Sequence, residues 1–557
     1  MKNKEFVPKL FSLWQGGISR SQWGHDVMSG VIVGIVALPL AIAFAIASGV
    51  SPEKGLITAI VAGLVISVLS GSRVQIGGPT GAFIIIVFGI VQEHGVDGLT
   101  IATFMAGFLI MGLGFLKLGN YLKFIPYPLI VGFTSGIAVV IFSTQIKDFF
   151  GLPLETVPAD FAQKWNVYFQ HIHSLNWIAL AIALGTVLIA TQFYRISKRI
   201  PGSLVAIVLA TFLVYEFDLP VDTIESRFGE IPNRIAMPHL PTINFEIIQS
   251  LIEPAIAIAL LGAIESLLSA VVADGMIGGK HRSNMELVAQ GAGNIFSGLF
   301  GGIPATGAIA RTATNVKNGG RTPIAGIVHA LFLLLIMLLF APIAKLIPLA
   351  SLAGILVVVA YHMSEWRNFR DLLRSNRMDA IVLLSTFFLT VFFDLILAIE
   401  IGMILSSFIF MKRMSEATRI TQAAGIFGLT DPNGEKLFEE ELPYIPDNVM
   451  LYEINGPLFF GAAHKFQEFI SELNHQPKVI IIRMRHVPFI DATAVNRLQE
   501  LTRNLQAKGT TMVVSGANRL VKEELLKAGF YALLGKQNIL GNINEAIVRA
   551  EELLQQP

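Results

Sequence analysis

The sequence predicts a polytopic α-helical membrane protein with about fourteen spans, followed by a smaller cytoplasmic α/β domain, and three observations support this class. First, 53% of the 557 residues are apolar and 15% are charged, whereas a soluble chain carries about 25% charged residues. Second, charged residues make up roughly 12% of residues 1–412 and roughly 22% of residues 413–557. Third, the first part contains many apolar runs of bilayer-spanning length. We therefore expect a membrane part followed by a soluble part.

The apolar runs give the predicted spans in chain order. Runs of full spanning length lie near 27–50, 55–70, 99–118, 127–146, 175–194, 251–276, 322–347 and 378–411. Shorter runs, broken by Gly and Pro, lie at 79–93, 202–217, 284–302, 305–316 and 350–362. If 378–411 is two spans that separate around Phe393 and Asp394, the total is about fourteen. An even number places both termini on the same side of the membrane.

The predicted domains follow from these runs. They are a cytoplasmic N-terminal segment 1–26, a transmembrane domain 27–412, a linker 413–440 and a cytoplasmic domain 441–557. We expect no cleavable signal peptide before the first span, because residues 1–26 lack a short apolar core followed by a small-residue cleavage site.

The distribution of Lys and Arg predicts the orientation. With the N-terminus in the cytoplasm, the inner loops receive roughly 18 Lys and Arg residues and the outer loops 6, which fits the positive-inside rule. Both termini and the C-terminal domain are then cytoplasmic, and the long loops 148–174 and 218–248 lie outside. The six outer residues are Lys54, Lys147, Lys164, Arg227, Arg234 and Lys345.

Composition excludes several classes of function. The chain has no cysteine, so it has no thiol nucleophile, no disulfide and no cysteine metal site. Its net charge of +1 argues against a nucleic-acid partner. Any metal site would have to be built from carboxylates, histidines and other oxygen ligands.

Two segments of the membrane part resemble each other. The run Gly77-Gly78-Pro79-Thr80-Gly81-Ala82-Phe83 is echoed by Gly301-Gly302-Ile303-Pro304-Ala305-Thr306-Gly307-Ala308, each before a short apolar stretch. Each segment is third in a series of seven spans, which predicts two inverted repeats, about 27–217 and 250–412. Half-helices that begin in mid-membrane expose N–H groups to an anion, and small residues allow close approach. The predicted substrate-binding residues are Gly78, Pro79, Thr80, Gly81, Ala82, Thr306, Gly307 and Ala308. The alternative is that both clusters are packing features or kinks in full spans.

Ionisable residues within apolar spans are the next candidates, because they are costly there. Glu265 lies near the middle of the span 251–276, and Ser269 follows one turn later on the same face. A carboxyl among Ala, Leu and Gly can take a proton from bulk water and release it when the cavity rehydrates. Glu265 and Ser269 are therefore the predicted coupling residues; the alternative is a protonated Glu265 that hydrogen-bonds a neighbouring helix.

Arg311 lies about one turn after the start of the second half-helix. Three roles are open for it: a fixed positive charge at an anion site, a partner for Glu265, or a side chain that extends toward the inner face near Lys317.

Several of these motifs resemble the SulP sulfate-permease family over nearly the whole chain. They are Ala263-Ile264-Glu265-Ser266-Leu267-Leu268, Ala289-Gln290-Gly291-Ala292-Gly293-Asn294-Ile295, Gly301-Gly302-Ile303-Pro304, Ala37-Leu38-Pro39-Leu40-Ala41-Ile42-Ala43-Phe44 and Gly49-Val50-Ser51-Pro52-Glu53-Lys54-Gly55-Leu56. The pattern is most similar to the bacterial branch that contains DauA, more than to that of BicA.

The resemblance implies core and gate domains, an elevator-type motion, a homodimer and a bacterial inner membrane. It also implies no enzyme activity, no cofactor and no metal site. It places a small anion between half-helices that start at Pro79 and Thr306, with the aromatic ring of Phe44 beside it. Members with Glu at the position of Glu265 are usually proton-coupled and sodium-coupled members have Asp there, so H+ is the expected coupling ion and Na+ the less favoured one.

The second part alternates strand-like runs with helical stretches near 462–474, 493–507, 518–528 and 541–554. Its run Gly456-Pro457-Leu458-Phe459-Phe460-Gly461-Ala462-Ala463 resembles the opening of a STAS domain. Thr493 stands where STAS antagonists carry a phosphorylated Ser, so it is a possible regulatory site. Ala492 and Ala494 depart from that pattern, and a helix cap by Asp491 or Thr493 also explains the turn.

Three functions remain open. The first is a secondary active transporter of sulfate or a C4-dicarboxylate, for which we expect faster uptake under an inward proton gradient. The second is a bicarbonate or chloride exchanger or a passive channel. The third is a membrane sensor that signals through a cytoplasmic protein partner of the STAS domain. The carboxyl of Glu265 beside two half-helices favours the first, because a passive pore does not need a proton acceptor in the bilayer.

Overall fold

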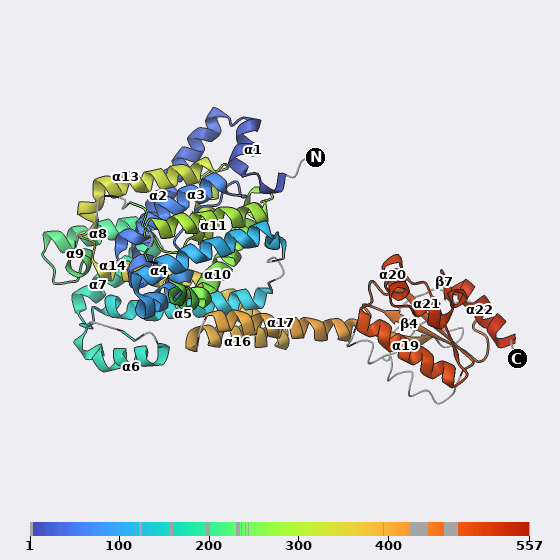
Figure 1. The fold of residues 1–557 in the computed structure, drawn as a ribbon. Coiled ribbons are helices and arrows are strands. Elements are labelled where there is room, and N and C mark those ends of the chain that lie inside the picture. The colour runs from blue at the N-terminus through green and yellow to red at the C-terminus, as the bar shows by residue number, and fades with distance from the viewer. Residues whose placement is uncertain are drawn as a thin grey trace. The chain divides into compact units, whose positions relative to one another are not determined.

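The chain divides into two compact units, Met1–Met403 and Ile404–Pro557. The computed structural model describes residues 4–555 except 122–124, 155–156, 159, 197–200, 230–233, 235–236, 240, 243, 394, 424–443, 460 and 462–476 (Figure 1). Lys123, Lys198, Arg199 and Asp394, most of the predicted linker and the predicted helix 462–474 therefore lie outside the described residues.

The first unit is helical. Its first-half helices are α1 Lys9–Gly16, α2 Arg20–Ala47, α3 Pro52–Leu69, α4 Ile84–Phe115, α5 Tyr127–Phe150, α6 Phe161–His171, α7 Trp177–Gln192, α8 Gly202–Glu216 and α9 Ile224–Phe228. Its later helices are α10 Phe245–Ile277, α11 Ser283–Leu299, α12 Ile309–Lys317, α13 Ile324–Ala344, α14 Leu349–Met363, α15 Trp366–Leu373 and α16 Arg377–Phe392. Helix α17, Leu395–Ala417, begins in the first unit and ends in the second. Among the described residues, seven helices are long and apolar enough to cross a membrane, and two shorter ones are also apolar.

The helices fall into two packing groups. In one, α13 packs on α2 and α3, α3 on α11, α11 on α4, and α4 on α10, as the parallel ribbons in Figure 1 show. In the other, α5 packs on α14, α16 and α7. Their apolar residues, such as Val33, Ile66 and Ile110, are fully buried, and this burial stabilises the arrangement.

The first spanning helix begins earlier than the sequence predicts. It starts at Arg20, inside the predicted cytoplasmic segment 1–26, and Ser19 caps its N-terminus. The polar residue Asp26 is tolerated within α2 because its carboxylate accepts hydrogen bonds from the backbone N–H of Arg321 (2.8 Å) and from the hydroxyl of Thr322 (2.6 Å).

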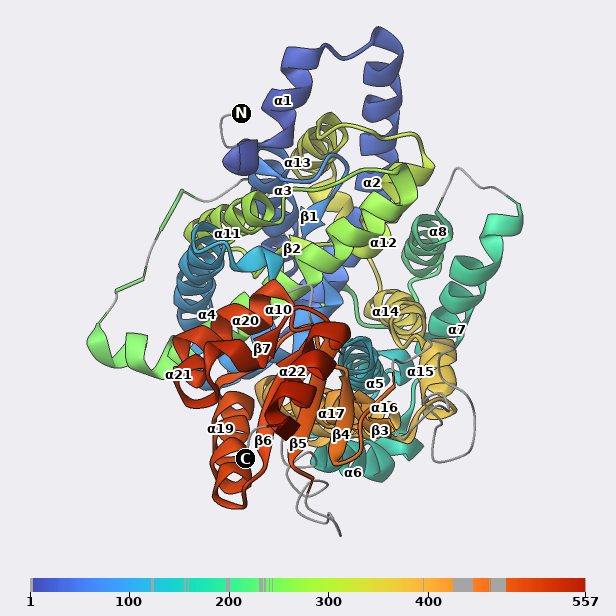
Figure 2. The same cartoon turned by 90° about the vertical axis from the view of Figure 1, so that its right-hand side faces the viewer.

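Two short strands cross at the centre of the helical unit. Strand β1 (Gly77–Gly78) pairs antiparallel with β2 (Thr306–Gly307), and Figure 2 shows the pair between α3, α10 and α12. A 3-10 turn, η2 (Gly81–Phe83), leads from β1 into α4. Helix α4 contains a non-helical residue, Gly95, with φ +68°, so its first part is a separate short helix. The chain therefore has two half-helices that leave one strand pair.

The second unit is an α/β domain. Its strands are β3 Arg419–Ala423, β4 Val449–Asn455, β5 Val479–His486, β6 Thr511–Ser515 and β7 Ile539–Leu540, and they form one sheet in this order. Strand β3 is antiparallel to β4 and the others are parallel. The helices are α19 Ala492–Ala507, α20 Arg519–Lys527, α21 Phe530–Leu534 and α22 Ile543–Gln555. Because β3 falls within the predicted linker 413–440, the sheet begins earlier than the sequence suggests.

Candidate functional site

The strand crossing brings the two motifs of the sequence together. Gly78 pairs with Thr306 and Gly77 with Gly307, and the N–H of Ala308 donates to the carbonyl of Ile76 at 2.9 Å. The small residues allow the strands to cross in a fully buried position. The half-helices after Pro79 and Thr306 then start from the same place, so their unpaired N–H groups and positive dipole ends converge there.

Helix α10 holds β2 in place through hydroxyl groups. The hydroxyls of Ser266 and Thr306 lie 2.7 Å apart, the Thr306 hydroxyl donates to the carbonyl of Gly262 (3.0 Å), and the N–H of Gly307 donates to Ser266 (3.2 Å). Ser266 and Thr306 are both fully buried. These contacts give Thr306 and Ser266 a positioning role in the site.

Glu265 lies on α10 next to Ser266 and reaches the opposite half-helix. The Thr80 hydroxyl donates to Glu265 Oε2 at 3.4 Å. Within the described part of the chain, this is the one hydrogen bond to that carboxylate. Both residues are only half-buried, unlike Ser266. The carboxylate of Glu265 therefore lies between α10 and the start of the first half-helix.

Ser269, the other predicted coupling residue, lies away from this carboxylate. Its hydroxyl donates to the Thr312 hydroxyl at 3.3 Å, and Thr312 accepts from the N–H of Ile76 at 3.0 Å. Ser269 is fully buried. It therefore joins α10 to α12 behind the crossing.

Arg311 is buried in the crossing, with 2% of its surface exposed. One guanidinium nitrogen donates to the carbonyl of Pro79. The other, Nη1, faces Gly78 and has no hydrogen-bond partner among the described residues. Of the three roles open from the sequence, extension toward the inner face does not fit this burial, and the described residues contain no ion pair between Arg311 and Glu265. Arg311 thus places a positive charge beside the first half-helix.

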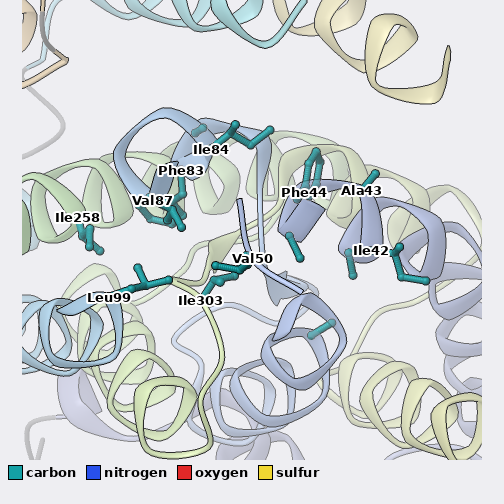
Figure 3. Packing of buried hydrophobic residues seen from close by; sticks show 14 of the residues in the cluster. Ile42, Ala43, Phe44, Val50, Phe83, Ile84, Val87, Leu99, Ile258 and Ile303 are labelled. Atoms are coloured by element: carbon teal, nitrogen blue, oxygen red, sulfur yellow. The ribbon is translucent and has the colours of Figure 1, made fainter. Parts of the chain in front are cut away.

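Phe44 of α2 borders the start of the first half-helix. A Cβ built on Gly81 would lie 3.4 Å from Phe44 Cε1 and 3.1 Å from Ile141 Cδ1, so the ring borders the backbone of Gly81. Phe44 is 5% exposed, and Ala82 beyond it is fully buried. Figure 3 shows Phe44 on α2, and Phe83, Ile84 and Val87 on the half-helix.

Two residues of this region were not predicted. Gln75 donates from Nε2 to the carbonyl of Ser266 (3.0 Å), and its Oε1 has no partner among the described residues. His329 of α13 is fully buried, and neither ring nitrogen has a hydrogen-bond partner in the described part of the chain. Gln75 lies two residues before the first motif, and His329 is an ionisable residue within an apolar run; both signals are visible in the sequence.

Thr493 lies at the first turn of α19 and is exposed. The cap of that helix is made by Asp491, whose side chain accepts from the N–H of Ala494 at 2.7 Å. The Thr493 hydroxyl is thus not required for the cap. Its role as a phosphorylation site stays a prediction.

Comparisons with known proteins agree with this architecture. Residues 24–386 match the model of the sulfate permease family, and residues 443–546 match that of the STAS domain. The chain is 42% identical over 531 residues to the Bacillus subtilis protein named "Putative sulfate transporter YvdB", covering 95% of this chain and 98% of that protein. It is 30% identical over 550 residues to the bicarbonate transporter BicA of Picosynechococcus sp., covering 94% of each chain.

A solved structure has the same fold over almost the full length. The structure of SLC26A9 superposes with a TM-score of 0.87 at 17% identity, covering 99% of this chain and 93% of that one. The predicted fold class, a multi-pass helical membrane part followed by a STAS domain, is confirmed. The branch within the family stays a prediction.

Proposed function

The chain belongs to the sulfate permease family, and on this premise we propose that it is a proton-coupled symporter of a small dianion, sulfate or a C4-dicarboxylate. It is a multi-pass membrane transporter of the anion-transporter class and not an enzyme. The proposed part concerns the substrate, the coupling ion and the mechanism.

The observation that carries the proposal is the hydrogen bond between Thr80 and Glu265. It places a titratable carboxyl on α10 against the start of the half-helix on which the anion would bind. A negative Glu265 opposes an incoming anion, and a protonated Glu265 does not. Proton uptake and anion binding therefore favour each other, and by linkage the effect is reciprocal. A gradient of either species then drives the other.

Arg311 and the half-helix dipoles supply the attraction for the anion. The unpartnered Nη1 of Arg311 faces Gly78, and the first N–H groups of the two half-helices, which follow Thr80 and Ala308, add hydrogen-bond donors. The predicted binding residues from Gly78 to Ala82 and from Thr306 to Ala308 are proposed to surround the anion, with Phe44 at one side. This donor set suits a carboxylate or sulfate oxygen.

We also propose the two inverted repeats of seven spans, and the packing supports them. Suppose that α2, α3, α5 and α7 of the first repeat correspond to α10, α11, α14 and α16 of the second, and that the later part of α4 corresponds to α13. Replacing each helix by its counterpart in the other repeat then converts one observed packing pair into another observed pair. The pair α2–α13 becomes α10–α4, the pair α3–α13 becomes α11–α4, and the pair α5–α16 becomes α14–α7, all of which are in contact. The two packing groups would be the core and gate domains of an elevator-type transporter.

Transport by the purified protein in vesicles tests the proposal. We expect uptake of labelled sulfate or succinate to rise under an inward proton gradient, and Glu265→Gln to remove this dependence. Glu253→Gln is a matched control, because Glu253 lies on the same helix but is exposed. Uptake that ignores pH, together with a fully active Glu265→Gln variant, would disprove the coupling.

Bicarbonate is the second candidate substrate, favoured by the 30% identity to a bicarbonate transporter. Competition by sulfate, succinate, fumarate, bicarbonate and chloride against one labelled anion distinguishes the candidates. A homodimer in a bacterial inner membrane, with cytoplasmic termini and a protein partner for the STAS domain, completes the proposal.

A further inference from the structure

A cavity lined in part by the helix α6 lies beside the proposed anion site. Its volume is about 240 Å³. It borders the site because its lining includes Ala43, next to Phe44, and Phe88 on the first half-helix. The other lining side chains include Gln145, Lys147, Asp148, Lys164, Tyr168 and Arg227, so the cavity wall carries more basic than acidic groups.

Lys164 and Tyr168 are the unusual members of this wall. They are four residues apart on α6, so they lie on the same face of the helix, and they are only 3% and 2% exposed. The Tyr168 hydroxyl has no hydrogen-bond partner, and Lys164 has no ion-pair partner, among the residues that the structure describes. The Lys164 ammonium lies 6.0 Å from the centroid of the Phe88 ring.

Helix α6 is fixed in a way that keeps these two side chains turned inward. Asp160 caps its N-terminus by accepting from the N–H of Gln163 at 2.8 Å. Trp165 Nε1 donates to the Ser143 hydroxyl of α5 at 3.1 Å, and the Phe161 ring packs edge-on against Phe392 of α16. These contacts hold the Lys164 side chain on the cavity side of the helix, with 3% of its surface exposed.

The acidic group of the cavity is already neutralised. Asp148 forms an ion pair with Arg227 at 2.8 Å, so it does not compensate Lys164. Burial lowers the pKa of the Lys164 ammonium, and Asp160 only partly opposes this effect. A buried cation without a partner is costly, and an anion in the cavity would remove that cost.

A second cavity continues from the first. It has a volume of about 410 Å³ and shares Lys147, Asp148, Arg227 and Leu349 with the first cavity. The Asp148–Arg227 ion pair thus stands in the wall common to both. This face holds the loops 148–174 and 218–248, which the sequence predicts to be outside.

We propose that this cavity is a vestibular anion site, in which the Lys164 ammonium and the Tyr168 hydroxyl bind a small oxyanion of the sulfate or carboxylate class before it reaches the half-helices. The inference rests on the proposed anion transport and adds a second site to it. Its ligands come from an outer-loop helix and not from the repeat motifs.

A binding assay that needs no transport tests the site. The chain has no cysteine, so Val157→Cys, which lines the cavity, introduces a single thiol. We expect sulfate to slow the labelling of this thiol by a membrane-impermeant thiosulfonate several-fold. Adding Lys164→Met should raise the sulfate concentration needed for half-maximal protection by about tenfold, the usual loss of affinity for one hydrogen bond to a charged group, and Tyr168→Phe should raise it less.

Two controls make the outcome decisive. Lys164→Arg should keep the protection because it keeps the charge, and Arg234→Gln, which removes an exposed charge from the same predicted face, should leave it unchanged. The inference is overturned if sulfate protects the thiol equally with Lys164 and with Lys164→Met, provided that size-exclusion chromatography shows both proteins to be folded. If protection depends on Lys164 but the protein transports no anion, the vestibular site is supported and the proposed function is disproved.

Discussion

The hydroxyl of Thr80 donates to the carboxylate of Glu265 at 3.4 Å and so connects the start of one half-helix with a helix of the other half of the chain. Thr80→Val removes this donor at nearly constant volume. We expect proton-driven uptake to fall about tenfold, because hydrogen bonds to charged groups are worth about 1.5–3 kcal/mol. Thr80→Ser keeps the hydroxyl and should keep most of the activity. Equal rates for the two variants, measured in the same vesicles, would contradict this role.

Ser266 is predicted to matter more for stability than Ser269, although both are fully buried on α10. Ser266→Ala leaves the N–H of Gly307 without its acceptor, and a buried unsatisfied group costs about 1–3 kcal/mol. Ser269→Ala loses one 3.3 Å contact to Thr312 and should cost about 1 kcal/mol or less. Thermal unfolding in detergent measures the difference, and a less stable Ser269→Ala variant would reverse the ranking.

Gly78→Ala should abolish anion binding in a folded protein. Gly78 has φ +153°, and a Cβ there would meet Nη1 of Arg311, so the guanidinium must move. The control is Gly89→Ala on the same half-helix, where nothing lies within 4 Å of the added carbon; it should gain up to about 1 kcal/mol in stability. Isothermal titration with sulfate reports the binding, and wild-type affinity in Gly78→Ala would exclude Arg311 from the site.

Glu286 offers a contrast to Glu265 because its carboxylate is fully enclosed and satisfied. It accepts from the Ser70 hydroxyl (2.5 Å), the N–H of Ser72 (3.0 Å) and Gln290 Nε2 (2.8 Å). Glu286→Gln replaces one acceptor oxygen by a donor and should destabilise the fold by about 1–3 kcal/mol. Anion uptake by the protein that still folds should keep its proton dependence. A loss of proton dependence in Glu286→Gln would mean that coupling is not confined to Glu265.

The sequence was most informative where the residue pattern is local. Hydropathy indicates the helices and the Gly-Pro-Thr motifs indicate the crossing, because each depends on neighbours in the chain. It was least informative where partners are distant in sequence. Ser269 shares a helical face with Glu265, yet its partner is Thr312 of another helix, and the burial of Arg311 depends on Pro79 and Gly78. The inward position of Lys164 likewise depends on contacts between α6 and two spans, so a loop lysine gives no sign of it.

Asp491 and Thr493 provide the last test, in the STAS domain. Asp491 caps α19 through the N–H of Ala494, whereas Thr493 is exposed and does not contribute to the cap. Asp491→Ala should therefore destabilise the first turn of α19 by about 1 kcal/mol, and Thr493→Ala should not. Hydrogen exchange on the full-length protein would show faster exchange of Ala494 and its neighbours in Asp491→Ala only. Faster exchange in Thr493→Ala would show that the threonine caps the helix. Phosphorylation of Thr493 would then disrupt the cap, whereas it would otherwise only modify an accessible hydroxyl.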